Sequence, residues 1–195
     1  MKGEDMTPSL KTMRDIIRLL LLPAFVTVLS VYAQDARLQI NHLDRLAPRA
    51  IEAIEITLDE TSLRAVTKLA TLSAREQAKL MEQLNRLKGV YMRGYEFAND
   101  GEYSEADVDA LRAQLNAPGW QRIVEVRGRR GEKDEVYLMP QNQEIVGFAA
   151  ISTEPRKLCV INIVGQIDLV EMNLLDKQFE FKRCGMGLGG RQRNR

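Results

Sequence analysis

Residues 144–165, EIVGFAAISTEPRKLCVINIVG, decide the fold, because two apolar runs are separated only by the turn-forming residues 153–156. Each run is rich in β-branched residues and is too short for a typical helix, so the pair is predicted to form neighbouring antiparallel strands at the centre of a sheet. Alternation in the second run places Cys159, Ile161 and Ile163 on one face and Leu158, Val160 and Val164 on the other, with Asn162 as the only strongly polar residue. Such strands are usually interior and are covered on at least one face.

The rest of the chain predicts helices followed by strands. The expected elements before residue 120 are a strand over 50–58, a helix capped by Asp59, a helix over 74–88 that ends at Gly89, a strand over 90–97, and a helix opened by the capping box of Ser104 and Asp107. Strands over 122–127, 135–139, 145–152 and 158–165 then form a meander. The predicted fold class is α+β, with an antiparallel or mixed sheet of about six strands and three to four helices packed mainly on one face.

The length of 195 residues suits one domain with a substantial core. We expect a signal peptide over 1–33, a leader over 34–45, a single α+β domain over 46–181 and a disordered tail over 182–195. The tail is basic and glycine-rich, with five basic residues and no acidic one.

The N-terminal segment has the pattern of a secretory signal peptide. Two arginines precede an apolar run over 19–31, and small or branched residues follow at the positions that predict cleavage between Ala33 and Gln34. The run is shorter than the ~18 to 20 residues that cross a bilayer, and Pro23 interrupts it. We therefore expect export to the periplasm or the extracellular space and no membrane span in the mature protein. An uncleaved inner-membrane anchor is the alternative.

Charge gives no reason to expect binding to nucleic acid. The net charge of the chain is +1, and removing the four basic and three acidic residues of 1–33 leaves 24 of each sign. Two segments nevertheless contain an excess of basic residues. Arg127, Arg129 and Arg130 either pair with acidic neighbours on a hairpin or form an interaction surface for an anionic partner, and the tail either has no function or contacts an anionic membrane surface.

No catalytic, cofactor-binding or metal site is predicted. His42 is the only histidine and lies in a polar stretch, so the usual zinc sites and Cys–His nucleophiles cannot be assembled. The oxygen-rich stretch 96–107 fails the EF-hand pattern because Ala98 occupies a ligand position. A turn followed by a helix cap explains it.

Two sets of residues leave alternatives open. Cys159 is interpreted as a small core hydrophobe, but export to an oxidising compartment also allows a disulfide with Cys184 or an intermolecular bridge through Cys184. The side chains of Tyr91, Tyr95 and Tyr137 either pack under helices or make an exposed face for a partner.

The order of motifs resembles a known family. The motifs are LAPRAIEAIEITLDETSLR, LKGVYMRGYEFANDGEYSEADVDALRAQL, GWQRIVEVRGRRGEKDEVYLM and IVGFAAISTEPRKLCVINIVGQIDL. Together they resemble the exported bacterial proteins catalogued as domain of unknown function 4252, over residues 46–172. The resemblance implies an exported or envelope-associated domain without an established activity, ligand or catalytic residue. Some members are encoded near extracytoplasmic sigma-factor systems, and the basic tail lies outside the pattern.

These observations favour an exported, non-enzymatic interaction or accessory module of the bacterial cell envelope, with a link to envelope stress signalling as an association. Its partner would be an unknown envelope protein or component. A hydrolase or transferase that uses Glu96, Asp100 and Tyr103 is the first alternative, and it requires a cleft with raised carboxyl pKa values. A carrier of a small apolar ligand is the second, and it requires a cavity between helices and sheet.

Overall fold

A computed structural model of the chain describes residues 35–66 and 74–169. The described elements are η1 Asn41–Arg49, β1 Glu52–Asp59, α2 Glu60–Val66, α3 Ala74–Arg86, β2 Leu87–Glu96, α4 Glu105–Leu115, β3 Gln121–Arg127, β4 Lys133–Gln141, β5 Glu144–Glu154 and β6 Lys157–Ile167. This content confirms the predicted α+β class.

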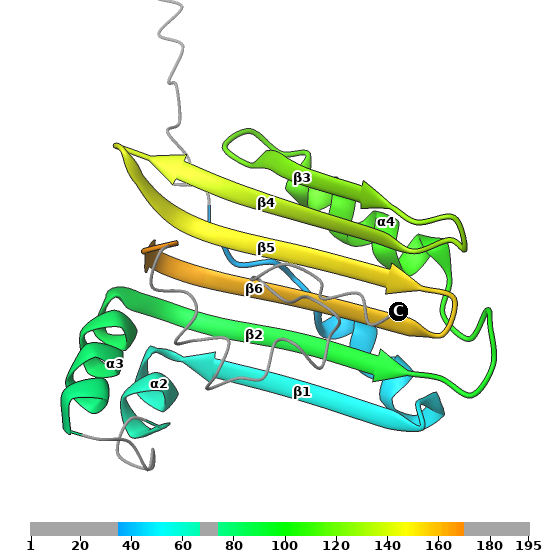
Figure 1. Cartoon of the computed structure of the whole chain (residues 1–195), viewed down its shortest axis with the longest axis horizontal. Helices are drawn as coiled ribbons and strands as arrows, with labels where there is room; N and C mark the ends of the chain where they lie inside the picture. Colours follow the sequence, from blue (N-terminus) through cyan, green and yellow to red (C-terminus); the bar gives the residue numbers. More distant parts are fainter. Residues whose placement is uncertain (1–34, 67–73, 170–195) are drawn as a thin grey trace, which may run out of the picture. The chain divides into compact units, whose positions relative to one another are not determined.

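The six described strands form one antiparallel sheet in the order β1-β2-β6-β5-β4-β3 (Figure 1). The predicted meander is confirmed, because β3 to β6 pair in succession. The β5–β6 hairpin occupies the centre, as the sequence of 144–165 predicts, and β6 also pairs with β2. The strand β6 is therefore an interior strand of the sheet, with a paired neighbour on each side.

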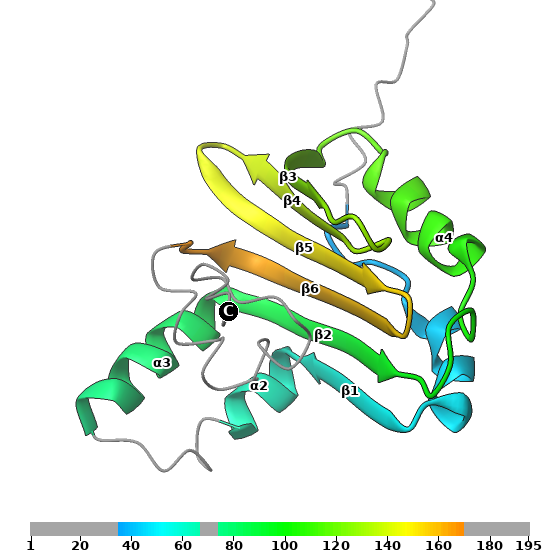
Figure 2. The same cartoon turned by 45° about the vertical axis from the view of Figure 1, so that its right-hand side comes forward.

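One side of the sheet, here called the α4 face, is covered by α4 and by residues 36–49, here called the N-terminal segment (Figure 2). Val108, Leu111 and Leu115 form the inner side of α4 and are buried. The three tyrosines of the sheet, Tyr91, Tyr95 and Tyr137, are buried here as well, which decides between the two interpretations in favour of packing.

The segment predicted as a leader, 34–45, instead contributes to this core. Its buried residues are Ala36, Leu38, Ile40 and Leu43, and Leu46 directly after it is buried as well. The first three alternate with polar residues, which hides them in a stretch that is polar on average. Residues 36–46 are therefore part of the folded unit.

Asn162 explains how this segment is held. Its side chain is fully buried on the α4 face, where its Oδ1 accepts a hydrogen bond from the Leu38 N–H at 2.9 Å. Its Nδ2 donates to the carbonyl oxygens of Ala36 at 2.9 Å and Phe148 at 3.2 Å. The polar residue of the central strand thus supplies the partners that the incoming backbone needs in an apolar interior.

The opposite side, here called the Cys159 face, carries the apolar residues Val90, Met92, Phe148, Ala150, Cys159, Ile161 and Ile163. Leu63 of α2 and Leu80 and Leu84 of α3 pack in the same cluster. The structure thus differs from the prediction that helices pack mainly on one face, because the central strands are apolar on both faces and each face requires a cover.

The boundary between α3 and β2 also differs from the prediction. The helix ends at Arg86 rather than at Gly89, and Gly89 lies in β2 opposite Val164. Leu87 already pairs with Gly165 of β6, and the two backbones approach so closely that a side chain at Gly165 would lie 2.5 Å from the carbonyl oxygen of Arg86. Strand pairing overrides the helical pattern of residues 87–88.

The predicted N-terminal caps of α2 and α4 are confirmed. The Asp59 carboxylate accepts a hydrogen bond from the Ser62 N–H at 2.8 Å, as predicted for the start of α2. At α4, the Asp107 carboxylate accepts from the Ser104 N–H and hydroxyl at 2.9 and 2.8 Å. The starts of α2 and α4 are therefore fixed by their local sequence.

Candidate interaction edge

β3 is an edge of the sheet and pairs only with β4 among the described strands (Figure 1). The exposed fractions of Ile123, Val124 and Val126 are 52%, 40% and 49%. Val124 lies opposite Val136, which packs against the apolar cluster of the Cys159 face. The edge strand therefore continues that apolar face into solvent.

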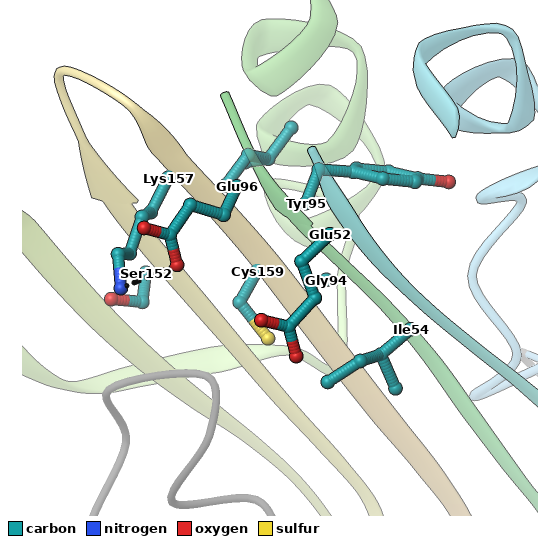
Figure 3. Close-up of a pocket in the computed structure, with 9 residues that line it drawn as sticks. Glu52, Ile54, Gly94, Tyr95, Glu96, Ser152, Lys157 and Cys159 are labelled. Atoms are coloured by element: carbon teal, nitrogen blue, oxygen red, sulfur yellow. Dashed lines mark ion pairs between the residues drawn. The ribbon is translucent and has the colours of Figure 1, made fainter. Parts of the chain in front are cut away.

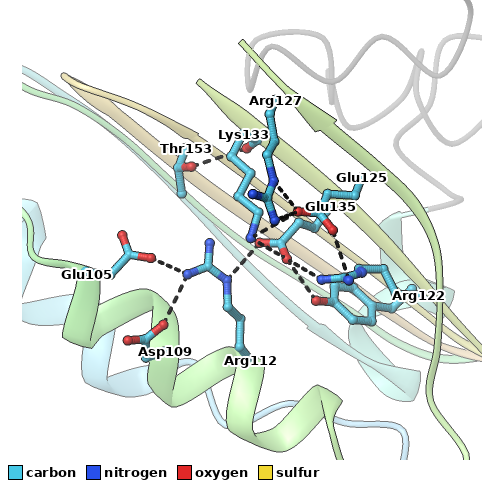
Figure 4. Close-up of polar contacts among 10 residues, drawn as sticks. Glu105, Asp109, Arg112, Arg122, Glu125, Arg127, Lys133, Glu135 and Thr153 are labelled. Atoms are coloured by element: carbon cyan, nitrogen blue, oxygen red, sulfur yellow. Dashed lines mark hydrogen bonds and ion pairs between the residues drawn. The ribbon is translucent and has the colours of Figure 1, made fainter. Parts of the chain in front are cut away.

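The other side of β3 is ionic and belongs to the α4 face (Figure 4). At its centre is the buried carboxylate of Glu135, which forms ion pairs with Arg112 at 2.8 Å, Lys133 at 2.9 Å and Arg122 at 3.5 Å. The Tyr137 hydroxyl donates to it at 3.0 Å. Because Arg112 lies on α4, the cluster joins the helix to the edge of the sheet.

Electrostatics keeps Glu135 ionised. Burial alone would raise its pKa, but hydrogen bonds from Lys133 and Arg112 and the positive charge of Arg112 outweigh burial, and the net pKa is lowered. A carboxylate held in this form is unsuited to donate a proton as a general acid. The arrangement therefore indicates a structural role.

The three arginines predicted as an interaction surface lie at the end of this edge. Arg127 is in β3 and pairs with Glu125, so its charge is partly neutralised. Arg129 and Arg130 are exposed in the connection to β4, and neither forms an ion pair with a described residue. The loop thus presents two cations beside the apolar strand.

Sequence analysis did not identify the apolar residues of β3 as a candidate site. Their β-branched pattern predicts the strand but does not say which face is covered. One indication is available, since the first strand of a meander is an edge unless a strand from elsewhere pairs with it.

A hollow of about 250 Å³ lies on the Cys159 face where β1, β2, β5 and β6 meet (Figure 3). Its lining residues are Glu52, Ile54, Gly94, Tyr95, Glu96, Ser152, Lys157, Leu158 and Cys159, all from strands. Glu96 and Lys157 form an ion pair of 2.9 Å at its rim. The hollow is therefore different from the cavity between helices and sheet that a carrier requires.

The residues considered for catalysis do not line a common hollow. Glu96 lines the hollow, whereas Asp100 and Tyr103 do not. The hydroxyl of Tyr103 donates to the carbonyl oxygen of Glu154 at 2.6 Å, and burial raises its pKa to about 12. His42 makes a contact of 3.1 Å between its Nε2 and the carbonyl oxygen of Asp107. These contacts give the tyrosine and the histidine positions in the packing of the α4 face.

Several predictions concern segments beyond the described residues. They are the cleavage site between Ala33 and Gln34, the tail over 182–195 and the state of Cys184. Within 35–66 and 74–169, no group of three or more histidine, cysteine or acidic side chains is placed to hold a metal ion. In the same ranges, no helix is long and apolar enough to cross a membrane.

The fold and its edge define an α+β domain built on a single antiparallel sheet. A family model described as "Domain of unknown function (DUF4252)" matches residues 50–175, more than half of the chain. The chain belongs to this family, as the resemblance of its motifs indicates. Comparison with curated proteins and with solved structures gave no match.

Proposed function

We propose that the protein is an exported, non-enzymatic interaction module of the bacterial cell envelope, and that it binds an extended polypeptide along β3. The observation that carries this proposal is the edge position of β3 together with the exposure of Ile123, Val124 and Val126. An added strand would satisfy the outward backbone groups of β3 and cover its apolar side chains.

The two edges of the sheet differ, which favours β3. The opposite edge, β1, carries acidic residues at Glu52, Glu55 and Asp59, and charges along an edge oppose strand addition. β3 has charged residues too, but they pair with one another and with Glu135 on the α4 face. The side of β3 that continues the Cys159 face is left apolar.

The charges beside the edge indicate the chemistry of the partner. Arg129 and Arg130 lie in the loop that follows β3. We expect a partner strand with apolar side chains at alternate positions and acidic residues at the end that meets this loop.

Two observations support export. The first is the sequence pattern of 1–33, and the second is that Cys159 is disulfide-bonded, because structural disulfides persist in oxidising compartments.

The buried carboxylates of Asp107 and Glu135 are held in the ionised form, so neither supplies the general acid of a hydrolase or transferase. Burial would raise the pKa of Asp107, but hydrogen bonds from Ser104 and the charge of Arg45 outweigh it, and the pKa is lowered as at Glu135. A hydrolase or transferase that relies on a general acid needs the opposite shift.

Capture of proteins from envelope extracts tests whether β3 binds a partner. The mature chain, residues 34–195, is immobilised, and we expect it to retain a protein in stoichiometric amount. The V124K/V126K variant should retain less than about a tenth of it, since charge and lost apolar contact oppose strand addition. The matched control is Ile51→Lys, which changes an apolar residue that is 67% exposed beside the other edge. Equal retention by V124K/V126K and the wild type would refute the role of β3.

Export is tested separately. N-terminal sequencing of the protein from cell fractions should find Gln34 as the first residue in the periplasmic or extracellular fraction. Intact chains that begin at Met1 in the cytosol would refute export, whatever the result for β3.

A further inference from the structure

The regular part of β3 is short, and its position limits how a further strand can pair with it. The register of β3 with β4 shifts between Arg122 and Val124, where the edge has a bulge. Pairing is regular after this point, and the Gly128 N–H extends it by donating to the carbonyl oxygen of Glu132 at 2.7 Å. Because a bulge bends a strand and disrupts its ladder, an added strand finds regular backbone only over residues 124–128.

The direction of the backbone groups along this run follows from the same hydrogen bond. The Gly128 N–H points to β4, and the backbone groups of alternate residues in an antiparallel strand point to the same side. Those of Val126 and Val124 therefore point to β4 as well, whereas those of Glu125 and Arg127 point away from it. The residues that offer backbone groups to an added strand thus carry side chains of opposite charge.

These two residues make the edge complementary to itself. The side chains of Glu125 and Arg127 lie together on the α4 face (Figure 4). The Arg127 side chain is 74% exposed, so it has room for a second carboxylate. When two copies of β3 pair antiparallel about a two-fold axis at Val126, each Glu125 lies opposite Arg127 of the partner subunit, and opposite charges in this position stabilise a strand pair.

Other registers fit less well. An axis at Glu125 or at Arg127 sets that residue against its own copy, and like charges directly opposite destabilise a strand pair. An axis at Val124 carries the pairing into the bulge. The axis at Val126 uses all of residues 124–128, and it sets the two copies of Val126, each 49% exposed in the single chain, against one another on the Cys159 face. This register therefore satisfies backbone, charge and apolar surface together.

We propose that the partner of β3 is the β3 strand of a second copy of this chain, and that the two sheets join edge to edge about an axis at Val126. The inference rests on the proposed function, because it requires that β3 accepts a strand, and it names that strand. Glu125 of the partner subunit is then the acidic residue expected beside the loop with Arg129 and Arg130. The two copies of this loop lie at opposite ends of the joined strands, about 20 Å apart, which exceeds the Debye length of about 8 Å at physiological salt.

Sedimentation velocity on the purified chain 34–195 tests self-pairing without other proteins. We expect a reversible dimer in the micromolar range, because one short strand buries little surface. E125R and R127E should each weaken dimerisation by at least about ten-fold, since each sets like charges opposite one another twice. An equimolar mixture of the two variants should recover the dimer, because the basic edge of E125R then faces the acidic edge of R127E.

Cross-linking tests the register. Val126→Cys should form a disulfide-linked dimer under mild oxidation, because the axis brings its two copies closer than the limit of about 7 Å between Cα atoms. Val124→Cys is the matched control, since Val124 is 40% exposed but its two copies would lie about 13 Å apart along the strands. The wild type under the same oxidation gives the background from the native cysteines. Linkage of Val124→Cys that is as fast as that of Val126→Cys would overturn the proposal.

The outcomes distinguish this inference from the proposed function. A wild-type chain that stays monomeric at millimolar concentration would overturn self-pairing, and so would a dimer that E125R and R127E leave unchanged. If V124K/V126K nevertheless loses a different envelope protein, β3 keeps its role and only the identity of the partner is wrong. Urea unfolding shows whether E125R and R127E are folded, and if either is not, the comparison of the two cysteine variants decides.

Discussion

At the scale of single residues, two buried polar groups specify how the parts of the α4 face meet. Asn162 joins the central strand to the N-terminal segment, and Glu135 joins β4 to α4. Each is surrounded by groups that satisfy it. A polar group in such a position specifies one arrangement, because every alternative packing leaves it without partners.

Replacing Asn162 by leucine should destabilise the protein by about 3 kcal/mol, since the Leu38 N–H and the Ala36 carbonyl would both lose their partner inside the core. Urea unfolding measures the loss, and hydrogen exchange at the Leu38 amide should become faster. A loss below about 1 kcal/mol would mean that water or a shift of the segment replaces these bonds.

Glu135 should make stability depend on pH. Its pKa in the folded protein is lower than the usual 4.5, so its contribution is present above about pH 4.5 and is lost as the pH falls through the folded pKa. Glu135→Gln should cost about 2 kcal/mol at pH 7, because Arg112 and Lys133 keep partial access to solvent. The difference from the wild type should shrink as the pH falls from 5 to 3.

The matched control for Glu135 is Glu105. This residue pairs with the same guanidinium of Arg112, but its side chain is 71% exposed. Glu105→Gln should therefore change the free energy of unfolding by less than about 1 kcal/mol. If the two variants behave alike in urea unfolding at pH 7, burial does not set the strength of the cluster.

At the scale of elements, the sequence correctly predicts those helices and strands whose bounds depend only on neighbouring residues. The cap of α4 and the strand β1 are predicted from neighbouring residues, and both are confirmed. The end of α3 coincides with the pairing of Leu87 with β6, far along the chain, so the pattern around Gly89 predicts it wrongly. The exposure of Val124 and Val126 depends on strand order, and no feature within β3 reports that order.

The two residues of the α4 capping box, Ser104 and Asp107, should contribute unequally to the free energy of unfolding. Ser104→Ala removes one cap partner and should cost about 1 kcal/mol. Asp107→Ala also removes the ion pair with Arg45 and leaves a buried gap, so it should cost about 3 kcal/mol. Urea unfolding of the single and double variants gives the coupling between them, and additive losses would mean that the reciprocal bonds are independent.

At the scale of the whole molecule, the family match and the physical core begin at different residues. The match starts at residue 50, whereas burial on the α4 face starts at Ala36. Residues 36–49 hold four of the buried aliphatic side chains of that face, namely Leu38, Ile40, Leu43 and Leu46. The core therefore extends beyond the segment that identifies the family.

A chain that begins at Ile51 should consequently fail to fold cooperatively, whereas the chain from Gln34 should fold. Each buried leucine or isoleucine contributes about 1.5 to 3 kcal/mol, so the loss of four of them is comparable to the whole stability of a domain, about 5 to 15 kcal/mol. The shortened chain also exposes the apolar surface of Tyr91 and Tyr95 and leaves Asn162 without two partners.

Circular dichroism with urea unfolding measures whether the shortened chain folds cooperatively. Leu43→Ala in the chain from Gln34 is the graded control, with an expected cost of about 3 kcal/mol and an intact cooperative transition. Cooperative unfolding of the shortened chain at the midpoint of the longer one would show that residues 36–49 lie on a core that is complete without them.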